Sequence, residues 1–147
     1  AVQNILRGMG ALSAGELAGE RMAVPYESKE QEDEHSCFSD NTLADIVGNA
    51  RGIRLAYTAD YEGVDGTSLS EVVAKLAPEV DADLRKQLDN NVAAAEALPA
   101  PFDQVIVGDD EHPGRAELLA LVEDLQDQGT AIAALASSLG LEISIEI

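Results

Sequence analysis

The sequence is poor in aromatic and basic residues and has no long apolar run. Its 147 residues include no tryptophan, three tyrosines and two phenylalanines. Nine basic residues stand against 28 acidic ones, which gives a formal net charge of −19. So acidic a chain is unsuited to bind the phosphate backbone of a nucleic acid or an anionic membrane surface. Because no stretch approaches the ~18 consecutive apolar residues of a membrane-spanning helix, we expect no transmembrane segment.

Cysteine occurs only once, so a disulfide within the chain is excluded. A catalytic thiol needs a nearby base and a positive environment, whereas Cys37 follows a run of acidic residues. We therefore interpret Cys37 as a small packed residue or as a soft metal ligand. A signal peptide is also lacking, and the chain opens directly on a helical pattern. This opening predicts a piece of a longer protein or a processed chain.

The sequence does contain alanine- and leucine-rich segments with the apolar periodicity of amphipathic helices. With their caps and prolines, these segments predict a first helix from Val2 to about Met22 that ends near Pro25, a second from Asn41 or Thr42 to about Tyr61, a short one capped by Ser68, an amphipathic one over 81–98, and a last one from Pro113 to about Ser138. The final LEISIEI alternates like a strand but has no obvious partner strand. The chain is therefore predicted to be all-α, one domain over residues 1–147, folded as an up-and-down bundle of about four main helices.

Two carboxylates on the first helix are candidate ligands. Glu16 and Glu20 lie one helical turn apart and continue a line that begins with Met9 and Leu12. Such a pair can serve one metal ion or one general base, and the adjacent Arg21 can neutralise an acid elsewhere. The alternative is an ordinary ion-pair network on the helix surface.

The most unusual stretch is QEDEHSCFSDNT, residues 31–42, which carries one of the two histidines, the only cysteine and four carboxylates. Imidazole together with carboxylates can bind iron, zinc or manganese. We therefore take His35, Glu34 and Asp40 as candidate metal ligands, and Ser39 as a candidate ligand-binding hydroxyl. A neighbouring carboxylate can instead hold the histidine in one tautomer and promote its protonation, as in acid–base sites. The remaining alternative is a loop histidine that hydrogen-bonds the backbone.

Three stretches together resemble the imelysin family of bacterial iron-regulated proteins. They are LRGMGALSAGELAGERMAVPYE, QEDEHSCFSDNTLADIVGNARGI and LPAPFDQVI, in that order along the chain. The resemblance is to the iron-regulated protein A branch of the family, which is also grouped with the M75 peptidases. It implies a helical protein of two bundle-like halves that is located in the periplasm or at the outer membrane and is linked to iron uptake.

The resemblance covers only the C-terminal half of the family pattern. The family carries a GxHxxE motif, usually in its N-terminal half, and neither His35 nor His112 has the required glycine and glutamate around it. The resemblance therefore implies that the partner of this chain is an N-terminal imelysin half with that motif, and it disfavours peptidase activity of this chain alone. A second departure is Leu43, which follows Thr42 where the family often has a histidine.

From these positions we hypothesise that a polar site forms near the end of the first helix. Its candidate members are Glu16, Glu20, Arg21, Glu34, His35, Cys37, Ser39 and Asp40. The expected ligand is iron, zinc or an iron-bearing molecule, and the expected function is binding in iron uptake. Two alternatives stay open: an M75-type metallopeptidase that uses a metal-bound water, and a structural bundle whose polar stretch merely orders a loop.

Overall fold

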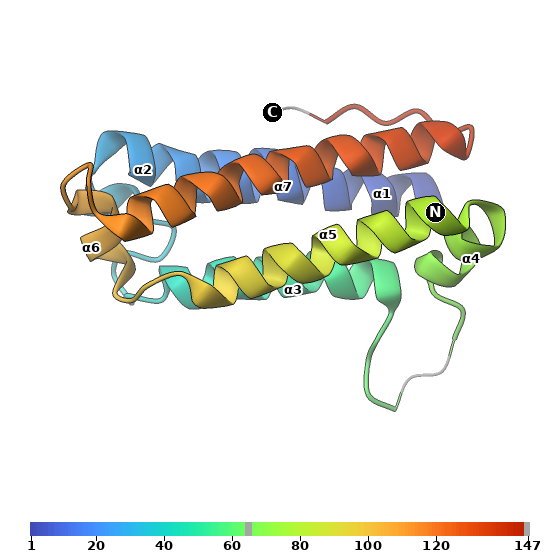
Figure 1. Cartoon of the computed structure of the whole chain (residues 1–147), viewed down its shortest axis with the longest axis horizontal. Helices are drawn as coiled ribbons and strands as arrows, with labels where there is room; N and C mark the ends of the chain where they lie inside the picture. The colour runs from blue at the N-terminus through green and yellow to red at the C-terminus, as the bar shows by residue number, and fades with distance from the viewer. Residues whose placement is uncertain (64–65, 146–147) are drawn as a thin grey trace.

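Antiparallel helical rods make up the molecule, and the chain runs up and down along them (Figure 1). The structure is a computed structural model that describes residues 1–63 and 66–145. Over these residues it contains helices and no strand. The helices are α1 (Val2–Gly10), η1 (Ala11–Ala23), α2 (Val24–Ser28), η2 (Gln31–Asp33), α3 (Thr42–Thr58), α4 (Leu69–Leu76), α5 (Pro78–Ala97), α6 (Phe102–Val107) and α7 (Pro113–Ser138). The predicted all-α, up-and-down bundle is therefore confirmed.

Four rods form the bundle. The segments α1, η1 and α2 follow one another without a break as the first rod, and α3, α5 and α7 are the other three. The first rod packs on α7 along its length and on α3, while α5 packs on both α3 and α7. The short helices α4 and α6 lie at opposite ends of the bundle (Figure 1). Within the described part of the chain, no helix has the length and apolarity that crossing a membrane requires.

Capping residues set the ends of α4 and α7, as the sequence predicts. Ser68 accepts a hydrogen bond from the backbone N–H of Glu71 at 3.0 Å, and the Glu71 carboxylate accepts one from the Ser68 N–H at 2.9 Å. This reciprocal pair satisfies two free amides at the start of α4. Pro113 occupies the first turn of α7, where the His112 ring accepts a backbone N–H at 3.1 Å. Beyond the other end, Gly140 has φ 73°, the left-handed geometry that commonly ends helices.

The first rod is longer than the sequence predicts. An end near Pro25 is expected, but the rod continues to Ser28 and turns only at Lys29, whose φ is 59°. Pro25 lies in the first turn of α2, where a missing N–H and a fixed φ are tolerated. The middle segment η1 is a π-helix, in which backbone hydrogen bonds span five residues instead of four. Residues five apart therefore share a face in this segment.

Polar side chains form a hydrogen-bonded chain across the middle of the core. Ser13 on η1 donates its hydroxyl to the Leu125 carbonyl at 2.7 Å and accepts from the Gln128 amide at 2.9 Å. Gln128 in turn accepts from the side-chain amide of Asn91 on α5 at 2.9 Å. The three side chains are buried and partnered. Such a satisfied network fixes the register of η1, α5 and α7 against one another.

A buried arginine joins three helices at the end of the bundle where α2 meets α6. Arg115, 4% exposed in the first turn of α7, donates to the Ile106 carbonyl at 2.7 Å and to the Tyr26 carbonyl at 3.0 Å. Its guanidinium carbon also lies 4.1 Å from the centre of the Tyr26 ring. The two carbonyls belong to the last turns of α6 and α2, where helices lack their own donors. One side chain therefore caps two helices and holds them against a third.

The last described residues form an extended segment that runs back along α7 (Figure 1). Leu141 and Ile143 pack against the core, and Gln3 of α1 donates to the Glu142 carbonyl at 2.6 Å. Alternate residues thus face the helices, which accounts for the strand-like pattern of this tail. No strand pairs with it among the described residues, and residues 146–147 lie outside them.

Candidate functional site

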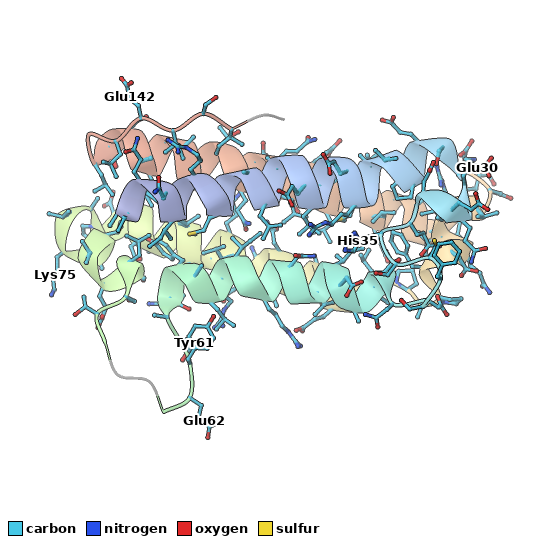
Figure 2. The ribbon with its side chains drawn as sticks, turned by 180° about the vertical axis from the view of Figure 1, so that it is seen from behind. Glu30, His35, Tyr61, Glu62, Lys75 and Glu142 are labelled. Atoms are coloured by element: carbon cyan, nitrogen blue, oxygen red, sulfur yellow. The ribbon has the colours of Figure 1, made fainter. Side chains whose placement is uncertain are left out.

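The polar stretch 31–42 lies between α2 and α3 at one end of the bundle, the end where Figure 2 labels His35 and Glu30. It begins with the 3₁₀ turn η2 and continues as hydrogen-bonded turns up to the start of α3. This stretch buries little apolar surface, because Phe38 is fully exposed and Cys37 is only half-buried. Its order therefore depends on hydrogen bonds.

Asp45, in the first turn of α3, holds this loop. Its carboxylate accepts hydrogen bonds from the Ser36 hydroxyl and from the Asn41 side-chain amide, the latter at 2.9 Å. The Ser36 N–H donates to the Thr42 hydroxyl at 3.2 Å. The helix dipole also favours an acid in the first turn. One carboxylate and two hydroxyls thus close the loop onto the start of α3.

Arg21 connects the first rod to the same corner. Its guanidinium donates to the Asn49 side-chain oxygen at 2.9 Å and to the Glu16 carboxylate at 3.0 Å. Asn49 donates in turn to the backbone carbonyl of Asp45 at 2.7 Å. Glu16 and Arg21 are five residues apart, the spacing that the π-helical backbone of η1 brings onto one face. A continuous chain of polar contacts therefore runs from η1 to the loop.

Glu34 is the loop carboxylate that turns inward. It is 5% exposed, and its Oε1 has no hydrogen-bond partner among the described residues. Burial raises the pKa of Glu34 above its ordinary value, the Thr42 hydroxyl opposes this rise, and the carboxylates of Asp103 and Asp40 add to it. Glu34 therefore keeps its proton to a higher pH than an exposed glutamate does.

The other loop candidates lie at or near the surface. His35 and Asp40 are exposed, and so is Ser39, whose hydroxyl donates to a loop carbonyl at 3.3 Å. Cys37 is a free thiol. Across the part of the chain that the structure describes, no three His, Cys, Asp or Glu side chains are arranged to hold a metal ion. The candidate ligands of the loop, Glu34 among them, therefore do not form a complete metal centre within these residues.

A groove of about 530 Å³ adjoins the loop between the start of α3 and the end of α5. Leu43 and Phe102 contribute to its apolar walls, and Asp40 lies where it meets the loop. Arg51 and Glu96 also line it and form an ion pair at 2.6 Å. Apolar walls with a few charged groups are typical of sites for small molecules. We call this the loop groove.

A second groove, of about 710 Å³, follows η1 and contains the remaining predicted carboxylates. Glu16 and Glu20 both line it, and both are exposed. The sequence aligns them with Met9 and Leu12, of which Met9 is buried and Leu12 half-buried. This alignment holds for an α-helix and is wrong here, because the wider turns of η1 place the two glutamates outside the core.

The predicted site is thus brought together only in part. Arg21 and Glu16 are connected to the loop through Asn49. Glu20 instead lines the groove along η1, and the side chain of His35 is exposed to solvent. Sequence reasoning missed Asp45, the residue that orders the loop. Its signal was available, since an acid in the first turn of a helix just after an asparagine is typical of helix starts.

The fold and the loop together define a class, a helical bundle with a polar corner at one end. The family comparison gives the narrower assignment. The imelysin family profile matches residues 1–132, and the chain therefore belongs to the imelysin family.

A solved structure with the same fold is an iron-regulated protein A precursor from Parabacteroides distasonis ATCC 8503. The two structures superpose with a TM-score of 0.71 at 21% sequence identity. The match covers 91% of this chain and 41% of the other. This chain therefore spans less than half the length of its structural relative. No curated protein matches it in sequence.

Proposed function

We propose that this chain is one helical half of an imelysin-type protein of the bacterial cell envelope, and that it binds a metal or an iron-bearing molecule in iron uptake. Membership of the imelysin family supports the class of protein. The name of the structural relative, an iron-regulated protein, supports a link to iron. A location in the periplasm or at the outer membrane is part of the same proposal.

The observation that carries this proposal is a loop held in place by hydrogen bonds while two of its three candidate metal ligands stay exposed. Asp45 fixes the loop through Ser36 and Asn41, while His35 and Asp40 stay exposed. Ordering a loop costs conformational entropy, and this loop buries little apolar surface in return. The loop would be ordered for a purpose if it presents these polar groups to a ligand.

The loop requires further ligands to hold a metal. His35, Glu34 and Asp40 do not form a three-ligand centre among the described residues. We assign the missing donors to the other half of an imelysin-type protein, the half that carries GxHxxE in the family pattern. The loop groove would then receive the cargo between the two halves.

Calorimetric titration of the longer protein with ferrous iron, ferric iron and zinc tests this proposal. We expect saturable one-site binding that His35→Ala and Asp40→Asn each weaken by at least about tenfold. Glu62→Ala is the matched control, because Glu62 is an exposed acid far from His35 (Figure 2). Binding that neither loop variant changes would overturn the role of the loop.

A second candidate function is metal-dependent proteolysis, since the matched family is also grouped as peptidase M75. It is distinguished by incubating the purified chain with an unfolded protein, with and without a chelator. Chelator-sensitive cleavage would favour the peptidase. No cleavage together with iron binding would favour the binding protein.

A further inference from the structure

The loop groove has the size and the walls of a site for an organic molecule rather than for a bare ion. Its volume is about 530 Å³, which lies in the range of ligand pockets in proteins. Leu43 and Val47 line it from α3, and Ala100 and Pro101 line it from the segment that leads to α6. These side chains are aliphatic, so the groove offers hydrocarbon contacts to the body of a ligand.

An accessible aromatic ring is lacking among the described residues that line the loop groove. Phe102 is the one aromatic residue of this lining, and it is only 2% exposed. An aromatic ligand gains affinity when its ring stacks on the ring of a protein side chain. Because the Phe102 ring is covered, the groove fits a ligand with an aliphatic body better than one with aromatic rings.

The charged residues of the loop groove give it a negative balance. Arg51 is the one basic residue in the described lining. Its Nε, at 3.0 Å, and its Nη2, at 2.6 Å, both donate to the same oxygen of Glu96, which therefore balances the charge of Arg51. Asp40 also lines the groove and forms no ion pair with any described residue. The negative charge of Asp40 thus stays uncompensated within the groove.

The charge of the whole molecule acts in the same direction as that of the groove. The formal net charge is −19, and nine of the 147 residues are basic. A strongly acidic protein draws cations toward clefts that carboxylates line, and it repels anions. A polyanionic ligand would therefore be repelled by the protein, and the one arginine in the described lining of the groove is already paired.

We propose that the loop groove binds the organic part of an iron-bearing molecule, and that it selects a ferric chelate with an aliphatic body and a net positive charge. This inference rests on the proposed function and names the class of its ligand. A ferric trihydroxamate with a terminal ammonium group has both properties, because three hydroxamates balance the charge of ferric iron. A ferric tris-catecholate has neither, since its rings are aromatic and each loses two protons. The aliphatic chain of the trihydroxamate would lie along Leu43 and Val47, with its ammonium in the negative potential of the groove.

Calorimetric titration of the protein at its natural length with three ferric chelates tests the ligand class. The first is the ferric complex of desferrioxamine B, whose terminal ammonium makes it cationic. The second is its N-acetylated form, which keeps the aliphatic body and loses the charge, and the third is a ferric tris-catecholate. We expect the cationic chelate to bind about tenfold more tightly than the acetylated one, with the catecholate weakest, and added salt to reduce the difference. Equal binding of the first two, tightest binding of the catecholate, or no binding of any chelate would overturn the proposal.

Gly48 allows the charge of the groove to be changed without a clash in the fold. It lines the loop groove, and a Cβ there would meet nothing within 4 Å. Gly48→Glu and Gly48→Lys add side chains of opposite charge, and Gly48→Gln is their neutral reference. Relative to Gly48→Gln, we expect the affinity for the cationic chelate to rise severalfold in Gly48→Glu and to fall severalfold in Gly48→Lys.

The matched controls for these variants are Ala134→Glu and Ala134→Lys, at an exposed position of α7 that does not line the groove. We expect their affinities for the cationic chelate to differ by less than about twofold, because water and salt screen distant exposed charges. Gly48 variants whose affinities do not follow the order of their charges would contradict the proposed site.

The ligand class and the proposed function can fail separately. Saturable binding of free iron that depends on His35, without the predicted order among the chelates, would overturn the ligand class alone. The predicted order among the chelates, in a protein whose affinity for free iron does not change in His35→Ala or Asp40→Asn, would overturn the role of the loop alone.

Discussion

At the scale of single residues, Asp45 and His35 lie at the same end of the bundle but differ in their hydrogen bonds to the rest of the chain. Asp45 accepts hydrogen bonds from the loop, whereas His35 is exposed. Asp45→Ala leaves two donors without their acceptor, and we expect it to lower the free energy of unfolding by about 1–3 kcal/mol. His35→Ala is expected to change it by less than about 0.5 kcal/mol. Urea denaturation followed by circular dichroism measures both, and equal losses would make the histidine a structural residue.

Glu34 gives the stability of the chain a defined pH dependence. Because its pKa is raised in the folded state, its stabilising contribution is complete below the ordinary glutamate pKa of about 4.3 and is lost as pH rises through the raised value. Glu34→Gln stays neutral at every pH. We therefore expect the variant to lose less unfolding free energy than the wild type as pH rises from about 4 to about 7.

Urea midpoints of both proteins across this range measure the effect of Glu34. Glu62→Gln serves as the control, because Glu62 is exposed. Stability curves for Glu34→Gln and the wild type that stay parallel from acid to neutral pH would contradict a raised pKa of Glu34.

At the scale of helices, one substitution should act in opposite directions at two glycines. Gly52→Ala adds a methyl group to a position with nothing within 4 Å, so we expect the unfolding free energy to rise by up to about 1 kcal/mol. Gly129→Ala places a methyl group 2.7 Å from the Ala14 side chain, so we expect a fall of about 1–3 kcal/mol. Thermal melts of both variants test the pair, and shifts of the same sign would contradict the packing.

We expect the packing of α2 and α6 against α7 to depend on the side chain of Arg115. Arg115→Met keeps the length of the side chain but removes the donors to Ile106 and Tyr26. Leaving buried carbonyls unpaired is expected to lower the unfolding free energy by about 3 kcal/mol. Arg115→Lys, which keeps the charge but not the forked donors, should recover only part of this loss. Full recovery by lysine would show that charge alone matters.

Local sequence signals predict helix ends where local chemistry decides them. Ser68, Pro113 and Gly140 act within one turn of the backbone, and the corresponding ends of α4 and α7 are confirmed. The end predicted at Pro25 is wrong, because a proline in a first turn is compatible with both a stop and a new start. The π-helical register of η1, the segment that packs against α7, does not follow from the local apolar periodicity.

Like the helix ends, the candidate site could be predicted from the sequence only in part. The outward loop with His35 and Asp40 follows from its composition, since it has almost nothing apolar to bury. The burial of Glu34 does not follow, because it depends on how the loop packs, and its raised pKa depends in addition on the nearby carboxylate of Asp103 on α6. The Glu16–Arg21 pair likewise depends on π-helical spacing rather than on the α-helical turn assumed from the sequence.

At the scale of the whole molecule, the acidic charge is unevenly distributed over the surface. The protein has a formal charge of −19, yet the groove of about 280 Å³ between α1 and α3 is lined by uncharged residues. The candidate metal ligands His35, Glu34 and Asp40 lie instead in the polar loop at one end of the bundle, where they do not complete a metal centre among the described residues.

The most direct measurement is a comparison of ferrous iron binding by the 147-residue chain and by the longer imelysin-type protein, in the same calorimeter and buffer. The account predicts one-site binding by the longer protein and binding at least about tenfold weaker by the chain alone, because the loop supplies only part of the ligand set. Equal affinity in the two proteins would show that the site is complete within this chain, and no binding by either would remove iron from its function.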